Sequence, residues 1–140
     1  MSIGVIGKVV LLFEKPWWND CGWYPFLWRG EDRQGLKKED SWLTNLSYAT
    51  TPMGNSQSMT LWSCGDIAKV VETLPEDVVK RKVMELIRRF MGKNKTIPEP
   101  IAMLRSTWHS NPYTRGSYTY DNVLTPQFPN ARATLAAPLV

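Results

Sequence analysis

Residues 7–14 read GKVVLLFE, and five consecutive apolar residues follow Lys8 in this run. A short continuous apolar run that includes β-branched residues is typical of a strand buried on both faces for much of its length. We therefore expect this strand to lie inside a sheet. Lys8 is open to two interpretations. Its stem could lie along the sheet with the amine at the edge, or the amine could point into a pocket and there hold a water or handle a proton.

Further segments typical of strands lie on the C-terminal side of this run, after Pro16 ends it. We expect these strands at residues 24–28, 42–50, 58–65 and 101–108. Residues 29–41, RGEDRQGLKKEDS, are rich in charge and predict an exposed loop.

Two helices are expected between residues 66 and 92. The segment DIAKVVETL (66–74) spaces its apolar residues as one helix face does, and PEDVVKRKVMELIRRFMG (75–92) carries a second apolar stripe. Thr73 and Glu76 match a capping box that would start the second helix. The order of strands and helices predicts an α+β domain: a mixed, largely antiparallel sheet with helices packed on one side.

The chain of 140 residues is long enough for one domain. We assign residues 1–124 to that domain. Residues 125–140 contain three prolines and show no periodicity, so we expect an extended C-terminal arm there. The net charge of +4 comes without a Lys/Arg cluster, which argues against nucleic acid as a partner.

Several classes of function and location are disfavoured by the composition. The apolar run near the N-terminus is too short to span a bilayer and lacks the pattern of a signal peptide, so we expect no membrane partner. Cys21 and Cys64 have no CxxC spacing and are expected to be free thiols in a reducing, intracellular compartment. His109 is the only histidine, which argues against a metal site and against Ser-His-Asp catalysis.

Residues 105–120, RSTWHSNPYTRGSYTY, crowd flat side chains among turn formers. Such a segment cannot be one regular strand or helix. Its aromatic rings suit either core packing at a sheet edge or contact with a planar ligand.

This run resembles the flavin-containing amine oxidases, and within them the polyamine oxidase branch of spermine oxidase and N1-acetylpolyamine oxidase. GKVVLLFEKPWW (7–18) is similar to the family's lysine-containing strand, and residues 72–106 are similar to its helix pair and Pro-x-Pro approach. ATLAAPLV (133–140) is similar to the stretch before the family's C-terminal flavin motif. The resemblance implies the amine-oxidase substrate-binding domain with its flavin-facing edge, lacking the complete FAD-binding domain.

The resemblance also implies roles for five residues. Lys8 matches the catalytic lysine that holds a water against the flavin. Trp108 and Tyr113 match aromatic residues at the flavin. Ser117 falls where monoamine oxidases carry the cysteine bonded to the flavin, so the FAD is expected to be non-covalent. Tyr118 matches one wall of the aromatic cage that binds the substrate.

The implied reaction oxidises an amine C–N bond of a polyamine, such as spermine or an N1-acetylated polyamine, to an imine. Molecular oxygen is converted to hydrogen peroxide. The family's dinucleotide-binding fingerprint and its Gly-Glu-Ala-Thr segment are absent, so we expect the isolated chain to be inactive. The expected location is cytoplasmic or peroxisomal.

The alternative is a non-catalytic module that binds polyamines or a partner protein. In that interpretation the aromatic slot acts together with an acidic segment, which contains Glu31, Asp32, Glu39 and Asp40.

Overall fold

The computed structural model describes residues 2–19, 21–54 and 57–138. Five strands form one sheet in the order β3-β4-β5-β2-β6, and every neighbouring pair is antiparallel. In sequence order these strands are β2 (Ile6–Leu12), β3 (Trp23–Pro25), β4 (Tyr48–Thr50), β5 (Ser58–Cys64) and β6 (Ala102–Arg105). The two ends of the domain meet in a separate antiparallel pair, β1 (Ser2–Gly4) and β7 (Tyr118–Tyr120).

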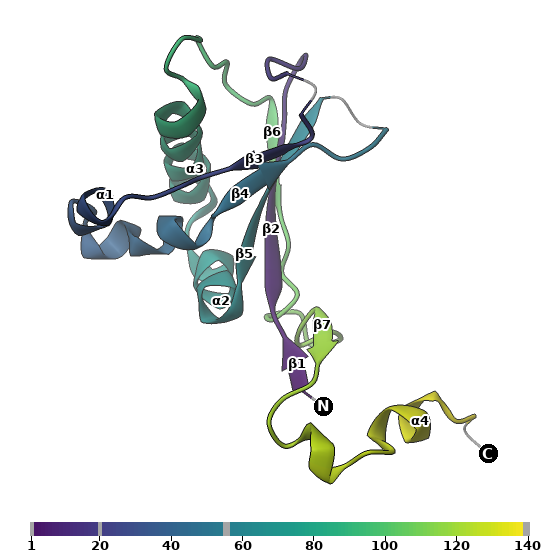
Figure 1. The fold of residues 1–140 in the computed structure, drawn as a ribbon. Coiled ribbons are helices and arrows are strands. Elements are labelled where there is room, and N and C mark those ends of the chain that lie inside the picture. Colours follow the sequence, from purple (N-terminus) through teal and green to yellow (C-terminus); the bar gives the residue numbers. More distant parts are fainter. Residues whose placement is uncertain (1, 20, 55–56, 139–140) are drawn as a thin grey trace.

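Helices cover one face of the five-stranded sheet. They are α1 (Gly30–Gln34), the 3-10 helix η1 (Lys38–Asn45), α2 (Gly65–Thr73) and α3 (Glu76–Met91). Figure 1 shows α1, α2 and α3 on the same side of the sheet. The predicted α+β class, with an antiparallel sheet and helices on one side, is confirmed.

Strand β2 lies between β5 and β6 in this sheet. Val9 and Leu11 are fully buried and join the core with residues of α3, whereas Lys8, Val10 and Leu12 are half-buried on the opposite face. Our expectation of a strand buried on both faces was therefore wrong for this structure. The burial alternates as it does for a strand with one covered face, because the helices pack on the other side.

The core lies between the sheet and its helices. It consists of Val9, Leu11, Phe13, Tyr24, Phe26, Trp42, Leu43, Leu46, Ala49, Met59, Leu61, Val71, Val79, Val83, Met84, Leu86, Ile87, Ile97 and Met103. The apolar stripe predicted for residues 75–92 supplies Val79, Val83, Leu86 and Ile87, while its Phe90 is partly buried against the core; α3 also contributes Met84, which lies outside the predicted stripe. Each fully buried aliphatic side chain contributes about 1.5–3 kcal/mol relative to an exposed one.

The strand expected at residues 42–50 is the main error in the predicted elements. Only Tyr48–Thr50 is a strand, and residues 38–45 form η1. Trp42 and Leu43 are both buried. Successive side chains of a strand point to opposite faces, so a helical turn is needed to bury these two neighbours in one core.

The charged segment 29–41 also differs from the exposed loop that we expected. It contains α1 and the start of η1, and Asp40 within it is buried. The Lys82 amine of α3 donates to an Asp40 carboxylate oxygen at 2.7 Å. This partner compensates for the desolvation that a buried carboxylate suffers.

Helices α2 and α3 lie within one or two residues of their predicted bounds, but the capping box is wrong. Pro75 takes the N-cap position of α3, and no side chain caps the helix. The Thr73 hydroxyl instead donates to the Val70 carbonyl oxygen at 2.8 Å, inside the end of α2.

The C-terminal arm is more regular than predicted. It holds the 3-10 turn η2 (Thr125–Gln127) and the short helix α4 (Ala131–Ala136), and it buries none of its described residues. Leu139 and Val140 lie outside the described residues. Figure 1 shows the arm running away from the sheet, beyond β1 and β7.

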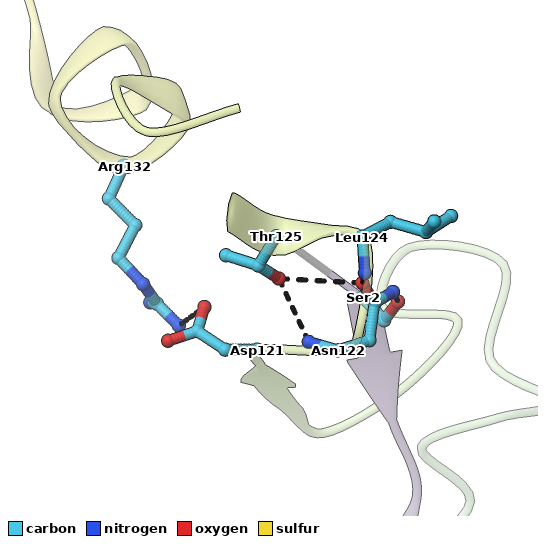
Figure 2. Close-up of polar contacts among 6 residues, drawn as sticks. All are labelled: Ser2, Asp121, Asn122, Leu124, Thr125 and Arg132. Carbon is cyan, nitrogen blue, oxygen red and sulfur yellow. Dashed lines mark hydrogen bonds and ion pairs between the residues drawn. The ribbon is translucent and has the colours of Figure 1, made fainter. Parts of the chain in front are cut away.

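Polar side chains join the start of the arm to β1 (Figure 2). The Asn122 side-chain amide donates to the Ser2 hydroxyl, and the Asn122 backbone N–H donates to the Thr125 hydroxyl at 2.8 Å. Arg132 reaches back from α4 to pair with Asp121 at 2.8 Å. The arm is thus attached at the two-stranded sheet, next to the segment that carries the predicted site.

Candidate functional site

A cavity of about 300 Å³ opens where β2 begins and the chain approaches β7. It is lined by Lys8, Trp108, Thr114, Gly116, Ser117 and Tyr118. Four of the five predicted site residues therefore share one cavity, although about 100 positions separate Lys8 from the others in sequence.

The position of Lys8 is fixed through its backbone. The Lys8 N–H donates to the Ser106 hydroxyl at 2.8 Å, and the Ser106 N–H donates to the Lys8 carbonyl oxygen at 3.0 Å. Register places Lys8 directly opposite Trp62 of β5. The Lys8 amine lies 4.4 Å from the centre of the Trp62 ring, a cation–π distance. The amine thus lies over a ring of the neighbouring strand β5, and Lys8 also lines the cavity; its catalytic role stays a prediction.

The Trp62 ring is held in turn by its neighbours. Its indole N–H donates to the Thr50 hydroxyl at 2.9 Å, and it stacks on Tyr48 with the ring centres 6.2 Å apart. This orientation presents a π-face to the Lys8 amine, which keeps an electrostatic partner without an acidic side chain.

Ser117 lies at the junction of β1 and β2. Its hydroxyl accepts a hydrogen bond from the Ile6 N–H at 2.7 Å, and its own N–H donates to the Gly4 carbonyl oxygen at 2.9 Å. The adjacent Gly116 is buried, and a Cβ there would lie 2.1 Å from the Ile3 Cγ2 atom. The glycine therefore lets the cavity wall approach β1 closely.

Three aromatic residues of the predicted site differ in how they are placed. Trp108 and Tyr118 line the cavity and are 40% and 56% exposed, so both offer ring surface to a ligand. Tyr113 is 94% exposed and does not line the cavity. Its role at the flavin stays a prediction, and the geometry does not bring it together with the other four residues.

Residues 107–116, here named the cavity loop, form a compact series of turns. The Asn111 N–H donates to the Thr107 carbonyl oxygen at 2.9 Å, and the Asn111 side chain accepts from the Tyr113 N–H at 2.9 Å. The Thr114 hydroxyl donates to the Trp108 carbonyl oxygen at 2.7 Å. Arg115 has a positive φ of 54°, which turns the chain towards Gly116.

Glu72 of α2 contacts the cavity loop with both carboxylate oxygens. One accepts the His109 N–H at 3.0 Å and the other accepts the Ser110 N–H at 2.9 Å. Burial raises the pKa of the Glu72 carboxyl, but the hydrogen bonds from His109 and Ser110 outweigh this effect, so its pKa lies below the ordinary value.

Some residues of this site had weak or no signals in the sequence. Thr114 and Gly116 lie between predicted residues, and only the glycine inside a run of large side chains hinted at a close approach. The contact of Trp62 with Lys8 depends on the β2–β5 register. The role of Glu72 depends on the path of a loop 37 residues further along the chain.

The acidic segment of the alternative function is partly occupied by internal ion pairs. Asp32 of α1 pairs with Arg89, and Asp40 of η1 pairs with Lys82. Two of the four carboxylates are therefore neutralised by side chains of α3.

The geometry above agrees with sequence comparisons. The family profile described as flavin containing amine oxidoreductase matches residues 1–138. The chain belongs to this family. It is 35% identical over 128 residues to the bovine (Bos taurus) peroxisomal N(1)-acetyl-spermine/spermidine oxidase and 35% identical over 131 residues to the human (Homo sapiens) protein of that name. Each match covers 86% of this chain and 24% of the relative, so the chain spans about a quarter of their length.

Solved structures of a putrescine oxidase have a similar fold. A putrescine oxidase bound to putrescine is similar with a TM-score of 0.53 and 16% sequence identity, over 84% of this chain and 24% of that chain. At this identity the likeness supports the fold alone. The fold of this chain is therefore that of one part of an amine oxidase.

The cofactor that family membership implies is a flavin. The cavity wall has a chemistry that fits it, because the Lys8 ammonium can donate to the nitrogen and oxygen acceptors of a flavin ring, and Trp108 and Tyr118 offer flat surfaces to a planar group. Among the described residues, no group of three or more His, Cys, Asp or Glu side chains could hold a metal ion. No described helix is long and apolar enough to cross a membrane.

Proposed function

We propose that this chain forms the substrate-binding part of an FAD-dependent polyamine oxidase, with its cavity as one wall of the flavin and amine site. The observation that carries the proposal is the convergence of Lys8, Trp108, Ser117 and Tyr118 on a single cavity in a chain of this family. The substrates we propose are spermine-like or N1-acetylated polyamines. They are suggested by the names of the bovine and human relatives.

In the proposed reaction, an FAD held at this cavity would supply the oxidising power for removal of a hydride from the carbon next to the amine nitrogen. The amine becomes an imine that water hydrolyses, and molecular oxygen takes the electrons to give hydrogen peroxide. Within this chain, the Lys8 amine would hold a water at the cavity wall. Trp108 would pack beside the flavin ring, and Tyr118 would form one wall around the reacting amine.

The placement of Ser117 supports a non-covalent cofactor. Its hydroxyl already accepts from the Ile6 N–H and lies 3.4 Å from the Gly4 carbonyl oxygen. A serine hydroxyl held in this way is a poor nucleophile, because the hydrogen bonds of the described residues join it to backbone groups and not to a base.

The alternative, a non-catalytic polyamine-binding module, is weakened by the ion pairs of Asp32 and Asp40, which occupy half of the acidic segment. Calorimetric titration of the purified chain with spermine, in the absence of flavin, separates the two functions. Binding at micromolar affinity without flavin would favour the alternative, and no heat would favour the oxidase.

The oxidase itself is tested in the natural gene product that contains residues 1–140. We expect it to bind flavin and to release hydrogen peroxide with spermine or N1-acetylspermine. A Lys8→Met variant should keep its flavin and lose about 100-fold in turnover, because a positioned acid–base group contributes about that much or more. A product with no flavin and no peroxide release would contradict the proposal.

The location belongs to the same proposal. The bovine and human relatives are named as peroxisomal, and we propose a peroxisomal or cytoplasmic location for the protein that contains this chain.

A further inference from the structure

Glu72 is a carboxylate on the buried face of α2, where a charged group needs partners that replace water. It is only 9% exposed, and its helix neighbours Ala68 and Val71 belong to the buried face of α2. A carboxylate removed from water is costly unless hydrogen bonds or opposite charges replace its hydration. Among the described residues, no Lys or Arg forms an ion pair with Glu72.

The compensation comes from the cavity loop. The N–H groups of His109 and Ser110, two consecutive residues, each donate to a different oxygen of Glu72, at 3.0 Å and 2.9 Å. Hydrogen bonds to an ionised acceptor are about twice as strong as neutral ones. In the described part of the chain, these two bonds are also the ones that join the cavity loop to α2.

The helix end that carries Glu72 is itself held firmly. The Arg105 guanidinium, at the end of β6, donates to the carbonyl oxygens of Val71 and Leu74, both at 2.6 Å. These carbonyls flank Glu72 and lie at the C-terminal end of α2, where a cation is favourable. The Glu72 carboxylate therefore projects from a helix end that Arg105 holds in place, and it lies next to the start of the cavity loop.

The loop residue before His109 is Trp108, which lines the cavity. Among the described residues, the other hydrogen bonds that tie the loop to the sheet come from the residues that flank it: Ser106, bonded to Lys8, and Ser117, bonded to Gly4 and Ile6. Gly116, at the far end of the loop from Trp108, also packs closely against β1. The internal bonds of Asn111 and Thr114 shape the loop without fixing it to the body. Glu72 thus holds the two residues that directly follow Trp108 in the chain.

We propose that Glu72 is a positioning residue, whose carboxylate holds the cavity loop on α2 and thereby sets where Trp108 stands in the cavity wall. The claim that Trp108 faces a flavin rests on the proposed function. The attachment of the loop to α2 is independent of that function, so it is tested on the 140-residue chain without cofactor or substrate.

The first test compares Glu72→Gln with the wild type by NMR. A Gln side chain keeps the shape but replaces one acceptor oxygen with an NH₂ donor, so it can accept only one of the two N–H groups. We expect the Trp108 indole signal to move and the protection of the Asn111 amide from hydrogen exchange to fall at least about tenfold, as loss of one charge-assisted hydrogen bond predicts. Neither group contacts Glu72 directly, so both report on the position of the loop.

A matched control is Glu14→Gln, which removes an exposed carboxylate at the end of β2. Amides of Val9 and Leu11 in β2 report on global stability and should keep their protection in both variants. An unchanged Trp108 signal with normal Asn111 protection in Glu72→Gln would overturn the proposal. A loss of protection in β2 equal to that in the loop would also overturn it, because the effect would then be global.

The second test titrates the wild-type chain and so needs no variant. Because the pKa of Glu72 lies below its ordinary value, the attachment is complete at neutral pH and is lost as the pH falls through the folded-state value. The Trp108 indole signal should follow that titration, and Glu72→Gln should abolish the transition. A transition that persists in Glu72→Gln would contradict the proposal.

Other charged groups near α2 define the background of this titration. They are His109 of the loop, Arg105 of β6, Lys8 of β2 on the far face of the sheet, and two ion pairs. One ion pair joins Asp66 to Lys69 within α2, and the other joins Asp40 of η1 to Lys82 of α3. The Glu72→Gln variant keeps all of these groups, so a transition that it abolishes belongs to Glu72.

Discussion

Single residues decide how closely the walls of the cavity approach each other. Lys8, Ser117 and Tyr118 could be predicted as neighbours only through a family resemblance, because no spacing rule joins positions so far apart in sequence. The same family resemblance placed Tyr113 at the flavin, yet its ring is exposed to solvent and does not line the cavity. The Asn111 turn, which fixes the Tyr113 backbone, is a local feature that the aromatic pattern did not reveal.

Gly116 offers a test at this scale. In Gly116→Ala the new Cβ would lie 2.1 Å from the Ile3 Cγ2 atom and 3.0 Å from the Gly4 carbonyl oxygen, so β1 must move. We expect the free energy of unfolding to fall by about 1–3 kcal/mol, the usual cost of overpacking. Urea unfolding followed by circular dichroism measures the change.

The control for this substitution is Gly30→Ala, where no atom outside the neighbouring residues lies within 4 Å of the new Cβ. Gly30 begins α1, and alanine is a better helix former than glycine. The free energy of unfolding of the Gly30→Ala variant should therefore stay the same or rise slightly. Equal losses in the two variants would show that steric contact with β1 is not the cause.

At the scale of elements, periodic patterns predicted the helices well and the irregular segments poorly. The bounds of α2 and α3 follow an apolar stripe that any helix must show in order to pack on a sheet. The segment predicted as a strand, residues 42–50, contains the β-prone residue types Trp, Thr and Tyr, but burial of the neighbours Trp42 and Leu43 in one core requires a helical turn. That choice depends on tertiary contacts, which override local propensity.

The ion pair between Lys82 and Asp40 joins α3 to η1, and it gives a prediction at this scale. Both side chains are less than one-fifth exposed. Asp40→Asn should lower the free energy of unfolding by about 1–2 kcal/mol, between the values for exposed and fully buried pairs. Lys69→Met, which breaks an exposed pair with Asp66, serves as the control and should change the stability little.

The pH dependence of this pair has a defined sign. The hydrogen bond from the Lys82 amine to Asp40 raises the pKa of Lys82 above the ordinary lysine value. Burial lowers this pKa and Glu85 raises it further, and the net shift is upward. The stabilisation is therefore complete below the unfolded-state pKa and is lost as the pH rises through the folded-state value. The difference between wild type and Asp40→Asn should stay constant near neutral pH and shrink in strong alkali. A difference that grows with pH would contradict the assignment.

At the scale of the whole molecule, the domain and its arm differ in how much they bury. The sequence predicted an arm without periodicity, but it did not reveal the short helix α4 or its link from Arg132 to Asp121. A helix of six residues is too short for a pattern to identify it. The attachment through Asn122 and Ser2 depends on the β1–β7 pair, which joins the two ends of the domain.

Two truncations test this division. A chain that ends at Leu124 should unfold in urea within about 0.5 kcal/mol of the wild type, because residues 125–138 bury none of their side chains. A chain that ends at Ser117 loses β7, leaves β1 without its partner, and should be clearly less stable. Equal loss of stability in the two truncations would mean that the arm supports the domain.

The pairing of β1 with β7 also has a consequence for the nascent polypeptide. Lys8 can meet Trp62 once the residues up to Cys64 have left the ribosome, because the β2–β5 pair needs nothing beyond Cys64. The cavity around Lys8 needs Ser117 and Tyr118, so it cannot exist until translation has passed these codons. During synthesis the Lys8 amine can therefore meet the indole ring before the cavity wall forms around it.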